Sequence, residues 1–153
     1  MVYLKPTDTI MPATNNGNIY AVTGHQFKQL LSLSKTAIVY VWAPHCHSNS
    51  CIPLQAIQSA CAKRNLDLYI LVEYYTDAFS QDYNVLAHPL FSVNEKYYHT
   101  VYCNAYMKQF ITDLLDSAVV KSNDDLLYKR FYLFSDGNLQ KVFDSLDEME
   151  SGL

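Results

Sequence analysis

Two continuously apolar stretches stand out along the chain. Residues 36–43, TAIVYVWA, and residues 67–74, DLYILVEY, are rich in β-branched and aromatic side chains. Apolar side chains at successive positions are typical of strands that are buried on both faces of a sheet. We therefore predict two buried strands, the first of them at the centre of the sheet.

Three other stretches repeat their apolar residues at helical spacing. The first follows Thr23, which forms a capping-box pattern with Gln26, and it continues to about Ser34. The second follows Cys51 and ends at the polar run Lys-Arg-Asn, and the third extends over about 94–119. These stretches predict three helices that alternate with the two buried strands.

The C-terminal region predicts a β-hairpin followed by a short helix. Residues 130–143, RFYLFSDGNLQKVF, form two strand-like runs around Asp136 and Gly137. Asp-Gly between such runs is a strong signal for a hairpin turn. Ser145 and Glu148 then fit the start of a last helix.

Two segments lack a regular pattern. Residues 5–18, KPTDTIMPATNNGN, are rich in Pro, Thr and Asn, so we expect residues 1–18 to form an extended leader. Residues 76–94 mix polar and apolar positions without a single period, and we assign them no element. The chain has 153 residues, half of them apolar, which suits one domain at 19–153.

Composition removes several classes of function. Charged residues make up 17% of the chain and the net charge is −4, so we expect no nucleic-acid partner. No apolar run is long enough to span a bilayer, and the start MVYLKPTDTI lacks the pattern of a signal peptide. If a signal or anchor ahead of the leader has been removed, the expected location is the cell envelope or periplasm. The chain has only four glycines, and they do not form a Gly-rich phosphate-binding motif.

Candidate chemistry lies in residues 42–51, WAPHCHSNSC, between the first buried strand and the second helix. Five positions along one helix rotate by about 140°, so Cys46 and Cys51 within a continuous helix would face apart. Pro53 is tolerated only in the first turn, which predicts that the helix begins at about Ser50. On this prediction Cys46 lies in a loop that can fold back toward Cys51, at the helix N-terminus.

The two remaining cysteines have a different setting. Cys61 and Cys103 fall inside helical patterns, where a buried thiol is the usual occupant.

The motif and the order of elements together resemble the thioredoxin-like superfamily. In that family a central strand ends in Trp-Ala-x-x-Cys, matched here by Trp42, Ala43, Pro44, His45 and Cys46. The resemblance covers about residues 19–150 and includes the Asp-Gly turn of the hairpin. It implies an α/β fold with a central mixed sheet, helices on both faces and a C-terminal hairpin.

The resemblance also implies roles for the cysteines, with two departures from the family pattern. Cys46 takes the attacking position and Cys51 the resolving one, whereas the helix N-terminus would give Cys51 the lower pKa. The family's pair is Cys-x-x-Cys, but here four residues intervene. Active members also carry a proline before the hairpin, where this chain has Lys129 and Arg130. A cation there either favours a thiolate or belongs to the solvated start of a strand.

Three functions fit these residues. The first is a thiol-disulfide oxidoreductase that acts on protein thiols or disulfides through Cys46 and Cys51 and needs no dissociable cofactor. His45 and His47 flank the pair and would tune its pKa.

The other two functions use the same residues without redox turnover. One is a redox-inactive binding protein in which a Cys46–Cys51 disulfide stabilises the fold by about 2 kcal/mol. The other is a copper or zinc site made of Cys46, Cys51 and one of His45 or His47. The resemblance to some thioredoxin-like copper chaperones, which use a distant histidine, implies His88 or His99 as that ligand.

Overall fold

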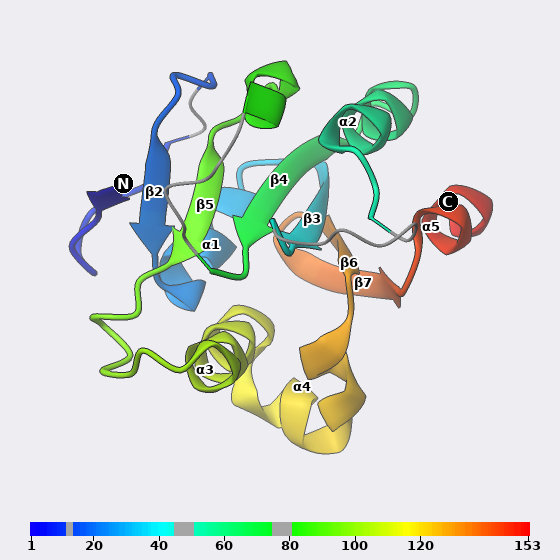
Figure 1. Cartoon of the computed structure of the whole chain (residues 1–153). Helices are drawn as coiled ribbons and strands as arrows, with labels where there is room; N and C mark the ends of the chain where they lie inside the picture. Colours follow the sequence, from blue (N-terminus) through cyan, green and yellow to red (C-terminus); the bar gives the residue numbers. More distant parts are fainter. Residues whose placement is uncertain (12–13, 45–50, 75–80) are drawn as a thin grey trace.

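The computed structural model describes residues 1–11, 14–44, 51–74 and 81–153, and it consists of a mixed sheet with helices on both faces (Figure 1). The sheet has seven strands in the order β1-β2-β5-β4-β3-β6-β7. The strands are β1 (Val2–Tyr3), β2 (Ile19–Val22), β3 (Thr36–Trp42), β4 (Asp67–Val72), β5 (Leu90–Val93), β6 (Phe131–Ser135) and β7 (Asn138–Phe143). The helices are α1 (Gly24–Leu31), α2 (Leu54–Ala62), α3 (Cys103–Leu115), α4 (Ser117–Ser122) and α5 (Leu146–Gly152), with 3-10 turns η1 (Gln81–Val85) and η2 (Asp124–Tyr128).

Five neighbouring strands of the sheet are parallel. β1, β2, β5, β4 and β3 all run in one direction, and β6 and β7 add an antiparallel hairpin beside β3. The prediction of a mixed sheet with helices on both faces is therefore confirmed. The two buried strands that the apolar runs predict are β3 and β4, which pair with each other.

The first face of the sheet packs against α1 and α3, and we call it the α1/α3 face. Its core contains Phe27 of α1, Phe110 of α3, and Val39, Tyr69 and Tyr132 of the strands. Phe27 meets the rings of Tyr69 and Phe110 with centroids 6.2 Å and 5.8 Å apart. Aromatic rings therefore fill the space between sheet and helices.

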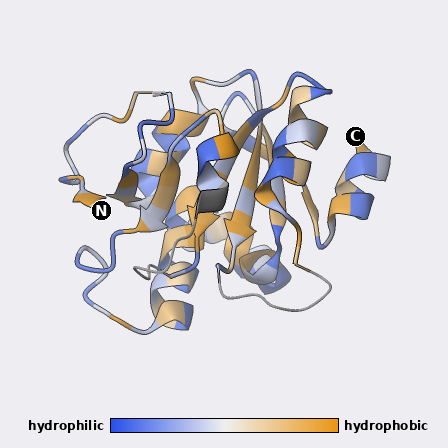
Figure 2. Cartoon of the chain, turned by 45° about the horizontal axis from the view of Figure 1, so that its top comes forward, coloured by the Kyte–Doolittle hydropathy of each residue, from blue (hydrophilic) through white to orange (hydrophobic). Residues whose placement is uncertain are grey.

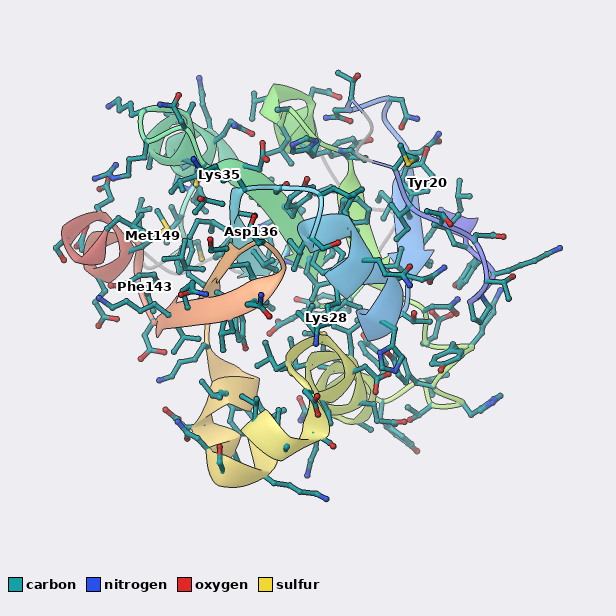
Figure 3. All side chains as sticks on the ribbon, turned by 180° about the vertical axis from the view of Figure 1, so that it is seen from behind. Tyr20, Lys28, Lys35, Asp136, Phe143 and Met149 are labelled. Atoms are coloured by element: carbon teal, nitrogen blue, oxygen red, sulfur yellow. The ribbon has the colours of Figure 1, made fainter. Side chains whose placement is uncertain are left out.

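The opposite face packs against α2 and α5, and we call it the α2/α5 face. Ile38 and Tyr40, which alternate with Val39 along β3, lie here together with Ile57 of α2 and Met149 of α5. Figure 3 shows Met149 close to Phe143 at the end of β7, and Figure 2 shows that the apolar strands lie between helices whose outer surfaces are polar.

Several local predictions are confirmed. Thr23 and Gln26 form the capping box of α1, and the side chain of Ser145 accepts a hydrogen bond from the Glu148 backbone at the start of α5. Asp136 and Gly137 both have positive φ, 49° and 77°, which is the turn geometry that joins tightly paired antiparallel strands.

Two helix predictions need correction. The expected helix over 94–119 is shorter, because residues before Cys103 form turns and Asp116 has φ 81°. Asp116 instead caps the separate helix α4 through its side chain. The second helix begins at Leu54 rather than at about Ser50, because Pro53 has an extended backbone and is its N-cap. Cys51 therefore precedes the helix.

The N-terminal residues contact the sheet and α1. β1 pairs with β2, and the side chain of Gln26 donates hydrogen bonds to the carbonyls of Lys5 and Asp8. Among the described residues, no helix is long and apolar enough to cross a membrane.

Candidate functional site

The candidate site lies where the parallel strands β3 and β4 end. In open α/β sheets the carboxyl ends of parallel strands are the usual place for a binding site. A cavity of about 240 Å³ opens there, which we call the Cys51 cavity. Residues from β3, β6, the segment before α2 and the β7–α5 connection line it, among them Tyr40, Trp42, Cys51, Arg130, Phe131 and Asp144.

The cavity brings together site residues that are far apart in the sequence. Trp42, Cys51 and Arg130 all line it, because antiparallel pairing of β6 with β3 puts residue 130 beside the end of β3. Pro44 is half-buried, two residues beyond Trp42. The predicted site residues His45, Cys46 and His47 lie outside the described residues, so the pairing of Cys46 with Cys51 stays a prediction.

Arg130 is held at the edge of the cavity by two acceptors. Its Nη1 donates to the Val41 carbonyl at 3.3 Å and contacts the Glu73 carboxylate at 3.5 Å. The Arg130 side chain is 42% exposed, so solvent still reaches its charge. The guanidinium thus lies at the edge of the cavity that Cys51 also lines.

Lys129 makes different contacts from its neighbour Arg130. Its ammonium lies 2.8 Å from the Asp125 carboxylate and 3.0 Å from that of Asp144. Hydrogen bonds to these two carboxylates raise the pKa of Lys129. Lys129 therefore connects η2 to the end of β7, and its charge is matched by acidic groups rather than directed at Cys51.

Tyr40 is a cavity residue that the sequence analysis missed. Its side chain is only 6% exposed, its ring stacks on Phe131 with centroids 4.7 Å apart, and burial raises its pKa. Its hydroxyl makes no hydrogen bond to any residue in the described part of the chain. Alternation along β3 could have indicated it, because a residue two positions before Trp42 points to the same face of the sheet.

A second cavity of about 260 Å³ lies on the other side of Arg130. Cys103, Met107 and Glu73 contribute to its lining. The Glu73 carbonyl accepts hydrogen bonds from the Cys103 thiol at 3.4 Å and from the Tyr106 hydroxyl at 2.7 Å. Arg130 is thus shared by two neighbouring cavities, one on each face of the sheet.

Cys61 and Cys103 are free thiols. Cys61 is fully buried on α2, as predicted, and burial raises its pKa to about 12. Cys103 is half-buried at the first position of α3, so the prediction of a buried thiol there is wrong, although burial still raises its pKa. Both groups are protonated at neutral pH and are poor nucleophiles.

The histidines considered as distant metal ligands lie elsewhere. His88 contacts Asp67 at 3.6 Å and stacks on Tyr69, at the amino ends of β4 and β5 and thus at the opposite end of the sheet from Cys51. His99 has φ 52° in the turns that precede α3. Within the ranges that the structure covers, no three His, Cys, Asp or Glu side chains are grouped to hold a metal.

Known proteins give no further guide to this site. No protein-family model matches the chain, and neither a curated protein nor a solved structure matches it.

Proposed function

We propose that the chain is a thioredoxin-like thiol-disulfide oxidoreductase that acts on other proteins through Cys46 and Cys51. The observation that carries the proposal is the Cys51 cavity. A cysteine, the tryptophan of the Trp-Ala-x-x-Cys motif and an arginine share this cavity at the carboxyl end of β3. Support also comes from the mixed sheet, the helices on both of its faces and the hairpin that ends it.

The proposed reaction is a pair of thiol-disulfide exchanges. A thiolate of one cysteine attacks a disulfide of the substrate, forms a mixed disulfide and releases one substrate thiolate. The second cysteine attacks the mixed disulfide and releases the other substrate thiolate. Two electrons pass to the substrate, and the protein is left with a Cys46–Cys51 disulfide.

Either cysteine remains a candidate for the first attack. By resemblance Cys46 attacks. Cys51 precedes the N-cap Pro53 and so lacks a place in the first turn of α2, which weakens the argument from the helix dipole. Arg130 lines the same cavity as Cys51, and its guanidinium also contacts Glu73.

A binding protein is the second candidate function. Tyr102 and Tyr128 are 77% and 75% exposed, and Tyr128 lines the second cavity. Exposed aromatic side chains are typical of protein-binding surfaces. In this case a Cys46–Cys51 disulfide would be structural, and it would persist only in an oxidising compartment such as the cell envelope.

Reduction of insulin disulfides separates the two functions. With dithiothreitol as the reductant that restores the two thiols after each turnover, we expect the wild type to catalyse the reduction. The variants Cys46→Ser and Cys51→Ser should lose at least about 100-fold of the rate, because each removes one of two required thiols. The matched control Cys103→Ser removes a thiol outside the Cys51 cavity and should keep the rate. An inactive wild type, or a Cys51→Ser variant with full activity, would reject the oxidoreductase.

The reduction potential of the Cys46–Cys51 pair separates the two functions independently of the insulin assay. A potential in the range of exchange proteins, roughly −270 to −120 mV, fits turnover. A potential below about −300 mV fits a structural disulfide and the binding protein.

A further inference from the structure

Five tyrosines are buried in the described part of the chain, and Tyr40 differs from the other four. The others use their hydroxyls: Tyr69 bonds to Ser34, Tyr98 to Asp113 and to the Gly24 backbone, Tyr106 to the Glu73 carbonyl and Tyr132 to the Leu126 carbonyl. The Tyr40 hydroxyl has no such partner among the described residues. A buried donor without an acceptor costs free energy, so natural proteins rarely leave one.

The position of Tyr40 indicates where its acceptor comes from. Tyr40 lines the Cys51 cavity, and its ring is held by stacking on Phe131, its direct partner across β3 and β6. An acceptor that enters this cavity would satisfy the hydroxyl. Burial raises the pKa of Tyr40, so the phenol stays protonated and is an uncharged donor at neutral pH.

The charges around the cavity disfavour a carboxylate as that acceptor. Arg130 contacts Glu73, and the cavity residue Asp144 contacts Lys129. Among the described residues, both cations beside the cavity thus already face a carboxylate. A second anion would have to compete with these pairs, whereas a neutral carbonyl needs only the donor that Tyr40 offers.

The volume of the cavity limits what enters it. At about 240 Å³ it is smaller than typical ligand pockets, which measure about 300–1,000 Å³. It therefore suits one residue of a larger molecule. Trp42 and Phe131 give it apolar walls, and Cys51 places a sulfur in the same space.

We propose that the Cys51 cavity binds a main-chain carbonyl of a peptide or protein substrate, next to the substrate's cysteine, and that the Tyr40 hydroxyl donates to it. This inference rests on the proposed function and specifies its substrate class. Disulfides flanked by amide groups are bound, and small disulfides that carry free carboxylates are bound less well.

Two probes that differ by one group test this specificity without any exchange reaction. One is N-acetyl-S-methylcysteine methylamide, and the other is N-acetyl-S-methylcysteine with its free carboxylate. Trp42 is the only tryptophan of the chain and lines the cavity, so its fluorescence reports binding to the full-length protein. We expect the wild type to bind the amide more tightly than the carboxylate.

The variant Tyr40→Phe removes only the proposed donor. It should weaken binding of the amide about five-fold, as expected for one hydrogen bond, and change binding of the carboxylate less. The control Tyr132→Phe removes a buried hydroxyl on the other face and should bind both probes as the wild type does.

Three results would overturn the inference. These are no binding of the amide by the wild type, equal binding by Tyr40→Phe, or tighter binding of the carboxylate. Because the probes contain no disulfide, these results are independent of the insulin assay, which alone tests whether the protein exchanges disulfides.

Discussion

The two faces of the sheet differ in whether their buried tyrosine hydroxyls form hydrogen bonds. On the α1/α3 face Tyr69, Tyr98, Tyr106 and Tyr132 each hydrogen-bond within the chain. On the α2/α5 face Tyr40 is as deeply buried but makes no such bond to the described residues. On the α1/α3 face every one of these hydroxyls is hydrogen-bonded, which is typical of a face that only stabilises the fold. A hydroxyl without a partner beside a cavity, as on the α2/α5 face, indicates a surface that binds another molecule.

Alkaline pH should lower the free energy of unfolding, and this is the largest effect that we expect. Burial raises the pKa values of Tyr98, Tyr106 and Tyr132 on the α1/α3 face. On the α2/α5 face, burial raises the pKa of Cys61 from 9.0 to about 12 and adds to the effect. The unfolded chain loses the Cys61 proton above about pH 9 and the tyrosine protons above about pH 10, whereas the folded chain keeps them. Above these values stability falls by about 1.4 kcal/mol per pH unit for each group.

Urea unfolding at pH 8, 10 and 11 measures this loss. We expect several kcal/mol of stability to disappear between pH 8 and pH 11, with fewer ionised tyrosines in the folded protein by ultraviolet absorbance. Equal unfolding free energies at pH 8 and pH 11 would show that these groups titrate alike in both states.

The variant Gly24→Ala should disrupt the close packing of α1 against α3. A Cβ at this position would lie 2.3 Å from the Phe110 carbonyl and 2.7 Å from the Asp113 Cβ, so a backbone must shift. We expect a loss of about 3 kcal/mol in the free energy of unfolding. The exposed neighbour Gln29→Ala should change it by less than about 0.5 kcal/mol. If both variants unfold alike, the two helices are not in tight contact.

Removing one tyrosine hydroxyl from each face compares how much these hydroxyls contribute to the free energy of unfolding. Tyr132→Phe leaves the Leu126 carbonyl without its donor and should cost about 1–2 kcal/mol. Tyr40→Phe removes a hydroxyl without a partner and should change the free energy of unfolding by less than about 0.5 kcal/mol. Denaturant midpoints measure both, and a Tyr40→Phe loss as large as that of Tyr132→Phe would reveal an acceptor for Tyr40 inside the protein.

The helix caps on the two faces should show the smallest difference. Thr23 is buried in the capping box of α1, so Thr23→Ala should cost about 1–2 kcal/mol. Ser145 caps the short α5 at an exposed position, so Ser145→Ala should cost about 0.5–1 kcal/mol. Thermal unfolding of the two variants checks the order, and the reverse order would contradict it.

The sequence predicts those parts of the fold whose signals are local. β3 and β4 are continuous apolar runs, and Asp136-Gly137 specifies its own turn. β2 and β5 were not predicted, because each has four residues and gains its stability by pairing with the other from far along the chain. The end of α3 at Asp116 depends on one residue with positive φ, which no periodicity reveals.

The candidate site was predictable to a similar extent. Trp42 and Cys51 stand in a recognisable motif, and Arg130 follows from its position before the hairpin. Tyr40 appears in the sequence as one more apolar residue of a buried strand. Its significance comes from the absence of an acceptor in the described structure around it, which becomes visible only once β3, β6 and α2 are assembled.

The pairing of β2 with β5 also sets an order of folding during synthesis. β2 (Ile19–Val22) has no inner neighbour in the sheet until β5 (Leu90–Val93) is made, and β4 keeps an open edge until then. A nascent chain shorter than about 93 residues therefore exposes two unpaired parallel edges, which attract other strands. Fragments that stop before β5 should associate with one another, whereas those that include it can close the N-terminal half of the sheet.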